Sequence, residues 1–185
     1  MTLLSLLGWF GTLCYLYAHA RISVLGKSAD PVYFGFNATA ALALVISSLA
    51  LMSWQPVAIN LFWLMVSIAS LQCWQLPKLP ISNRVLFASC LLMLLIGCGM
   101  LLQGSMSGIA VWGWSSTLAF CLGYWKFSAG RLQAKHYYLL NTYAAWILLF
   151  QLYQDGNWPV FGLEVVWGFI SLTAFLSTKS NDKPQ

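Results

Sequence analysis

One carboxylate lies deep inside a long apolar stretch near the end of the sequence. Glu164 is six residues into the segment Trp158–Ser177, about 9 Å along a helix that rises 1.5 Å per residue. If this segment crosses a bilayer, a charge at its centre costs roughly 2.5–3.5 kcal/mol, and such residues usually face a wet cavity and mark a pathway. A carboxyl group there would suit a proton- or cation-coupled step. The alternative is a Glu that bonds to a neighbouring helix as packing glue.

A second polar residue matches Glu164 by its place in an earlier apolar stretch. This residue is Asn60, and each of the two is followed three residues later by a tryptophan, Trp63 or Trp167. Spacing i, i+3 places both members of a pair on one helix face. Two such faces would offer two polar groups and two aromatic walls, the composition of a small-molecule pocket. The alternative is that both tryptophans face lipid or pack between helices.

Two further asparagines, Asn37 and Asn141, lie about one turn inside the ends of two other apolar stretches. They could form an inner gate, or they could bond backbone carbonyls and hold groups of helices together, which is the role we favour. Trp54 and Trp158 are expected in the aromatic belt at a membrane boundary.

Other chemistry finds little support in the sequence. His19 and His136 are too few to argue a metal site, and the chain has no C-x-x-C pair and no phosphate-binding or nucleophile motif. The four carboxylates are remote from one another in sequence: Asp30, Asp155, Glu164 and Asp182. We therefore expect neither an enzyme nor a cofactor or metal, and we leave a lipid-modifying enzyme only as a remote alternative.

The composition requires a lipid environment for these residues. Hydrophobic residues make up 60% of the chain and charged residues only 7%, against roughly 25% charged in a soluble domain. The segments long and apolar enough to cross a bilayer are Thr2–Ala20, Val32–Met52, Pro56–Trp74, Val85–Leu102, Ile109–Trp125, His136–Tyr153 and Trp158–Ser177. Only the last of them contains a carboxylate. We predict an all-α integral membrane protein with seven transmembrane helices.

The basic residues predict the orientation of these spans. All 9 Lys and Arg residues fall in the first, third and fifth connections and in the tail 178–185, and chance would sort them so roughly 1 time in 250. Basic loops face the cytoplasm, so the N-terminus is predicted outside and the C-terminus inside. We interpret the net charge of +5 as this orientation signal rather than as a nucleic-acid surface.

An internal repeat divides the chain. Residues 26–73 align without a gap on residues 130–177, with nine identities in 48 positions, including Asn37 on Asn141 and Trp63 on Trp167. Each copy holds three spans, and an odd span between them keeps both copies parallel. We predict a first three-helix unit (1–74), a linker with the fourth span (75–104), a second three-helix unit (105–177) and a cytoplasmic tail (178–185), a 3+1+3 arrangement.

This arrangement resembles the SWEET sugar transporters and the wider PQ-loop superfamily, and each unit is similar to small bacterial membrane proteins of three helices. The matching residues are Gly8-Trp9-Phe10-Gly11, Asn37, Trp54 and Asn60-Leu61-Phe62-Trp63 in the first unit, and Gly113-Trp114, Asn141, Trp158 and Glu164-Val165-Val166-Trp167 in the second. The resemblance implies a transporter with a central site, where SWEET-type proteins place an asparagine pair around the sugar. One member here is Glu, which favours a polar or cationic solute.

Two functions therefore remain open at this stage. The first is a small-solute transporter, either a uniporter or a proton-coupled carrier, in a bacterial inner membrane. The alternative is a non-transporting assembly or partner protein, in which Glu164 and Asn60 could be replaced by apolar residues without loss of activity. In both cases the lipid bilayer is a partner and nucleic acid is not.

Overall fold

The structure is a computed structural model that describes residues 2–23, 31–74, 77 and 80–178. The described residues form seven α-helices: α1 (Leu3–Ser23), α2 (Pro31–Ala50), α3 (Trp54–Leu71), α4 (Asn83–Leu102), α5 (Ser107–Ser128), α6 (Ala134–Asp155) and α7 (Trp158–Ser177). Each helix overlaps one predicted span, and α7 has the predicted bounds at both ends. Apart from Thr178, the predicted tail at 178–185 lies outside the described residues.

The sixth helix extends beyond its predicted span. The helix α6 continues to Asp155, so α7 is not the only helix with a carboxylate. The carboxylate of Asp155 lies at the last residue of its helix, where Ser53 Oγ donates a hydrogen bond to it. Because this hydroxyl satisfies the carboxylate, the helix can end on an acidic residue.

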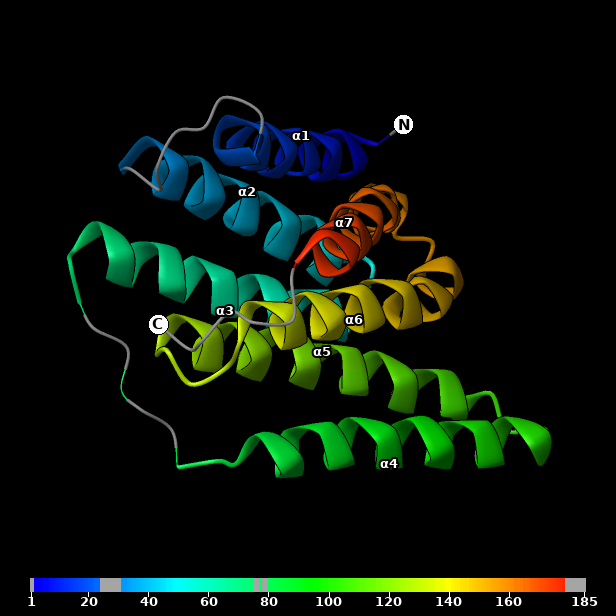
Figure 1. Ribbon diagram of the computed structural model, residues 1–185. Coiled ribbons are helices and arrows are strands. Elements are labelled where there is room, and N and C mark those ends of the chain that lie inside the picture. The colour runs from blue at the N-terminus through cyan, green and yellow to red at the C-terminus, as the bar shows by residue number, and fades with distance from the viewer. Residues whose placement is uncertain (1, 24–30, 75–76, 78–79, 179–185) are drawn as a thin grey trace. The chain divides into compact units, whose positions relative to one another are not determined.

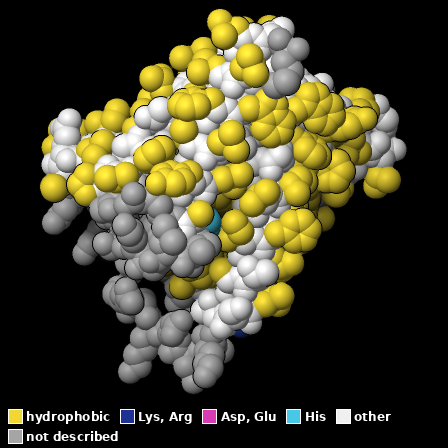
Figure 2. All heavy atoms as spheres, turned by 90° about the horizontal axis from the view of Figure 1, so that it is seen from above, with side chains coloured by type: hydrophobic (Ala, Val, Ile, Leu, Met, Phe, Trp, Pro, Cys, Tyr) yellow, Lys and Arg dark blue, Asp and Glu magenta, His cyan; other side chains and the backbone are white. Residues whose placement is uncertain are grey.

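The helices are those of a membrane protein. Among the described residues, five helices are long and apolar enough to cross a bilayer: α1, α2, α3, α4 and α7. Figure 2 shows hydrophobic side chains over most of the visible face. The exposed side chains of α4 include Leu91, Leu92 and Leu95, and a soluble monomer rarely leaves so large an apolar surface in water. We conclude that lipid covers these helices.

The helices divide into two compact units. Unit 1 comprises residues 1–75 and 155–163, and unit 2 comprises residues 76–154 and 164–185. In unit 1, α1 packs against α2 and α2 against α3; in unit 2, α4 packs against α5 (Figure 1). The first turns of α7 thus belong with α1–α3, and the rest of α7 belongs with α4–α6.

The predicted repeat recurs in the burial of individual side chains. On α2, the side chains of Ala40, Ala41 and Leu44 are fully buried, and their counterparts Ala144, Ala145 and Leu148 on α6 are fully buried as well. Small residues at these positions let neighbouring helices approach closely, as membrane helix packing requires. The counterparts Trp54 and Trp158 are also similarly exposed, at 55% and 50%.

The backbone repeats too, just before the third helix of each copy. Met52 and its counterpart Gly156 both have positive φ, 53° and 66°. The residues that follow, Ser53 and Asn157, are fully buried and immediately precede α3 and α7. A left-handed residue reverses the chain direction, so both copies make the same turn into their third helix.

Two glycines bring α4 and α5 together in unit 2. A Cβ atom at Gly108 would lie 2.5 Å from the carbonyl oxygen of Gly97 and 2.8 Å from Leu101 Cγ, while one at Gly97 would overlap the Trp112 ring. The indole N–H of Trp112 donates a hydrogen bond of 3.1 Å to the Leu94 carbonyl beside this crossing. At both positions an added side chain would clash, so glycine permits this close approach.

Replacing Gly108 by alanine is expected to destabilise the protein by about 1–3 kcal/mol, because the new methyl group must push two backbones apart. Gly99→Ala on α4 is the matched control, since a Cβ atom there meets no other atom within 4 Å. Thermal unfolding of both variants in detergent checks this. Equal melting temperatures for the two would show that the crossing tolerates a wider spacing.

Candidate functional site

Glu164 is the most unusual polar residue of the predicted site. Its side chain is 6% exposed, and within the described structure its buried Oε2 atom has no hydrogen-bond partner. An unsatisfied buried polar group costs about 1–3 kcal/mol, and more if it is charged. Among the described residues, Oε2 forms no bond to a neighbouring helix. The place of Glu164 on a solute or ion pathway stays a prediction.

Asn60, the repeat counterpart of Glu164, is buried and bonded differently. Its Nδ2 donates a 2.9 Å hydrogen bond to the carbonyl oxygen of Pro56, one turn earlier on α3. In an α-helix the Pro56 carbonyl accepts the backbone N–H of Asn60, and the Asn60 side chain adds a second hydrogen bond to the same oxygen. The corresponding residue in α7 is a carboxylate, which cannot donate unless it is protonated.

The two tryptophans are half-buried and have different neighbours. The Trp63 ring meets Phe62 edge-on, with centroids 6.2 Å apart. The indole N–H of Trp167 donates a 3.2 Å hydrogen bond to Asn141 Oδ1 on α6. Trp167 therefore ties α7 to α6 within unit 2.

Asn37 and Asn141 donate equivalent side-chain bonds, and their predicted roles, as an inner gate or as a link that holds groups of helices together, stay predictions. Each donates a 2.8 Å hydrogen bond to the carbonyl oxygen four residues earlier on its own helix, Tyr33 or Tyr137. The asparagines therefore bond within a helix, and the link between helices in unit 2 comes from Trp167. Identical bonds at equivalent positions again mark the repeat.

The four residues of the predicted central pocket belong to different units. Asn60 and Trp63 lie in unit 1, whereas Glu164 and Trp167 lie in unit 2. Their assembly into one site stays a prediction. Among the described residues no group of three His, Cys, Asp or Glu side chains could hold a metal ion.

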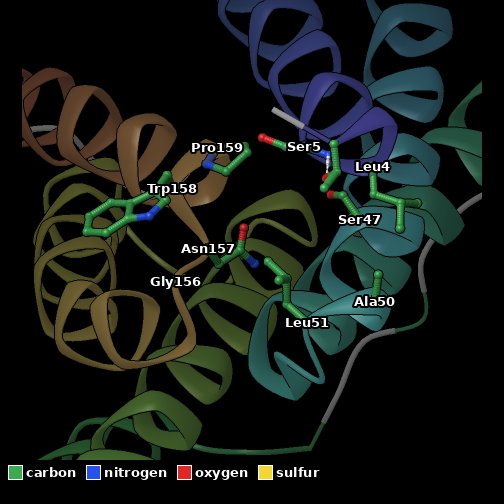
Figure 3. A pocket seen from close by; sticks show the side chains of 10 residues that line it. Leu4, Ser5, Ser47, Ala50, Leu51, Gly156, Asn157, Trp158 and Pro159 are labelled. Carbon is green, nitrogen blue, oxygen red and sulfur yellow. Dashed lines mark hydrogen bonds between the residues drawn. The ribbon is translucent and has the colours of Figure 1, made fainter.

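A polar pocket in unit 1 was missed by the sequence analysis. The turn between α6 and α7 reaches α1 and α2, where Thr12 Oγ1 donates a 2.7 Å bond to the Pro159 carbonyl and Asn157 Nδ2 donates a 3.0 Å bond to Ser48 Oγ. Around Asn157 the side chains surround an open space (Figure 3). The segment Asp155-Gly156-Asn157 lies between the sixth and seventh predicted spans, and no site was predicted there.

Comparison with known proteins bears on the repeat. No curated protein and no solved structure matches the chain. One family model matches twice, over residues 4–76 and again over residues 109–181. Each match spans the three helices of one predicted unit and leaves α4 outside. The chain therefore belongs to this family, and it contains two copies of the family's three-helix unit.

Proposed function

We propose that the protein is a small-solute membrane transporter, either a uniporter or a proton-coupled carrier. Its solute would bind between the two three-helix units, and access would alternate as one unit rocks against the other. The observation that carries the proposal is Glu164, a buried carboxyl group with an unsatisfied oxygen inside an apolar helix. Such a group is costly, and in membrane proteins it usually lies on a solute or ion pathway.

The architecture of the proposal is 3+1+3, with seven spans. The helices α5 and α6 are not among the five candidate membrane spans, but the family match makes them the counterparts of α1 and α2. If α1 and α2 cross the bilayer, their counterparts in a parallel repeat cross it too. The distribution of Lys and Arg then supports an N-terminus outside, a C-terminus in the cytoplasm and, by analogy with similar small proteins, a bacterial inner membrane. The SWEET and PQ-loop resemblance supports the same arrangement.

The solute is proposed to be polar and either cationic or coupled to protons. Asn60 is a neutral amide whose donor is used by its own helix. Glu164 offers a carboxylate in place of the second amide. A site with one acidic and one amide group would suit an amine or a proton-linked polar solute better than it suits a simple sugar.

Thermal stability of the purified protein in detergent tests this function. The compounds are sugars, nucleosides, vitamins, amines and metal cations. A true ligand at 100 times its dissociation constant should stabilise the folded state by about 2.7 kcal/mol. We expect at least one polar or cationic compound to raise the melting temperature, and the shift to vanish in Glu164→Gln.

The matched control is Asp182→Asn, which removes a negative charge from the predicted tail. It should leave the ligand-induced shift unchanged. No shift from any compound, together with a Glu164→Gln variant as stable as the parent, would contradict the transporter and favour the non-transporting partner role.

A further inference from the structure

Two neighbouring pockets follow the same two helices of unit 2, α4 and α6. Both helices begin on the side of the unit where α5 ends (Figure 1). The first pocket, of about 420 Å³, lies at these helix starts and is lined by Asn83, Gly130, Arg131, Gln133 and His136. The second pocket, of about 220 Å³, lies further along both helices and has an apolar lining.

Helical spacing joins the two linings into one surface. On α4 the second lining begins with Phe87, four residues after Asn83, and on α6 it begins with Leu139, three residues after His136. Residues three and four apart share a helix face. The rings of Phe87 and His136 meet edge-on between the helices, with centroids 5.8 Å apart, where one lining passes into the other. We call this surface the α4–α6 groove, polar at the helix starts and apolar further in.

The polar end of the groove offers a cation and hydrogen-bond donors that solvent reaches. Arg131, Gln133 and His136 are all exposed, and among the described residues neither lining contains a carboxylate. A guanidinium group binds phosphate oxygens through two parallel hydrogen bonds. The starts of α4 and α6 add partial positive charge of their own. This end therefore suits an anionic group, and a phosphate above all.

The turn that carries Arg131 is fixed by hydrogen bonds on both sides. Its backbone N–H donates a 2.8 Å bond to the carbonyl of Lys126 on α5, and its carbonyl accepts a 3.1 Å bond from Asn83 Nδ2 on α4. Lys126 Nζ in turn donates to the carbonyl of Ile81, just before α4. These bonds tie the end of α5 to the start of α4, so the guanidinium group extends from a backbone that is held in place.

The inner part of the groove is apolar and open to lipid. Its walls include Leu91, which is 57% exposed, and Leu139, which is 41% exposed. The hydroxyl of Tyr143 shares a 2.5 Å hydrogen bond with Ser115 Oγ, so its ring serves as wall. The lining on α4 continues for seven residues, about 10 Å of helix, against about 15 Å for the apolar half of a bilayer. Such a surface suits a hydrocarbon chain.

We propose that the α4–α6 groove binds one anionic phospholipid, with its phosphate at Arg131 and one acyl chain against the apolar part. Charge complementarity selects an anionic headgroup, and the apolar continuation selects a lipid rather than a free phosphate ion. Basic pockets between membrane helices bind acidic headgroups in this way. The groove lies within unit 2 and uses neither Glu164 nor Asn60, so it can fail without the proposed transport function, and the reverse also holds.

Native mass spectrometry of the full-length protein, released from detergent, counts bound lipids and tests the proposal. The probes are phosphatidylglycerol, phosphatidylcholine with the same acyl chains, and glycerol phosphate, which has the phosphate without the chains. We expect one phosphatidylglycerol to bind saturably and about tenfold more tightly than phosphatidylcholine, because only the anionic headgroup lacks a cation of its own to pair with its phosphate. Glycerol phosphate should not bind at the same concentrations.

Two matched pairs of variants locate the lipid. Arg131→Gln should weaken phosphatidylglycerol binding about tenfold. Arg84→Gln removes a like charge near the start of α4, outside the lining, and should change the affinity by less than about twofold. Leu91→Trp obstructs the groove and should weaken binding, whereas Leu92→Trp, at a similarly exposed position outside the lining, should not.

Four results would overturn the site. Equal affinities for the two lipids would show that the headgroup charge is not recognised, and equal losses in Arg131→Gln and Arg84→Gln would indicate attraction to the basic surface as a whole. Glycerol phosphate that binds as tightly as the lipid would identify a site for free phosphate. Binding that is the same in Leu91→Trp and Leu92→Trp would place the acyl chain elsewhere.

Discussion

Replacing Glu164 by leucine is expected to abolish solute uptake and at the same time to raise the thermal stability of the protein. The leucine removes a buried oxygen that has no hydrogen-bond partner in the described structure, and relieving such a group should stabilise the folded state by about 1–3 kcal/mol. Uptake should fall at least tenfold, because the variant can neither exchange a proton nor pair with a cation. Opposite effects of this kind are typical of residues kept for function at a cost in stability.

The measurement combines thermal unfolding in detergent with uptake into proteoliposomes, using the compound that shifts the melting temperature of the parent. Val166→Leu is the matched control, since it changes an exposed apolar side chain on the same helix and should alter neither property. Glu164→Gln should lose uptake with a smaller gain in stability, because an amide still carries polar atoms. A leucine variant that is less stable than the parent would instead identify Glu164 as packing glue.

The helices and the repeat could be predicted because both depend on signals along the chain. Unbroken apolar stretches of a membrane's width mark each helix, and α7 was predicted to the residue. The repeat depended on a few uncommon residues at constant spacing, such as Asn37 and Asn141. These have the same burial and the same side-chain bonds, and the family model finds the same two copies.

The missed features depend on contacts between segments that are remote in sequence. The pocket around Asn157 exists because the turn at 155–159 meets the end of α2, as the bonds from Asn157 to Ser48 and from Ser53 to Asp155 show. In the sequence, the bonded residues lie about a hundred positions apart, in two separate connections between helices. The alignment does pair Ser53 with Asn157, and this pairing of buried polar residues is the one signal that could have drawn attention to the site.

Side-chain direction was equally beyond the sequence. Helical spacing grouped Trp167 with Glu164 on one face of a helix. It could not show that the indole N–H bonds to Asn141 on α6, because that depends on the rotamers of two side chains and on the approach of two helices. The same bond makes Asn141 part of a connection between α6 and α7 within unit 2.

This connection leads to the second large expected effect, a loss of about 2–4 kcal/mol of stability on replacing Asn141 by alanine. Asn141 is 2% exposed, donates to the Tyr137 carbonyl and accepts the Trp167 N–H. Alanine removes both side-chain bonds and leaves a small cavity. The Tyr137 carbonyl keeps its backbone partner within α6, but the Trp167 N–H loses this acceptor, and such a loss costs about 1–3 kcal/mol. Thermal unfolding in detergent measures the loss.

The repeat supplies the control for this experiment. Asn37→Ala makes the same substitution at the equivalent buried position, where the bond that the amide donates goes to its own helix. It should cost less stability than Asn141→Ala. Trp167→Phe, which keeps an aromatic ring but not the N–H, should itself lower the stability by part of that difference. If Asn37→Ala and Asn141→Ala cost the same while Trp167→Phe costs nothing, the α6–α7 bond contributes no stability, and Asn141 would return to consideration as a gate.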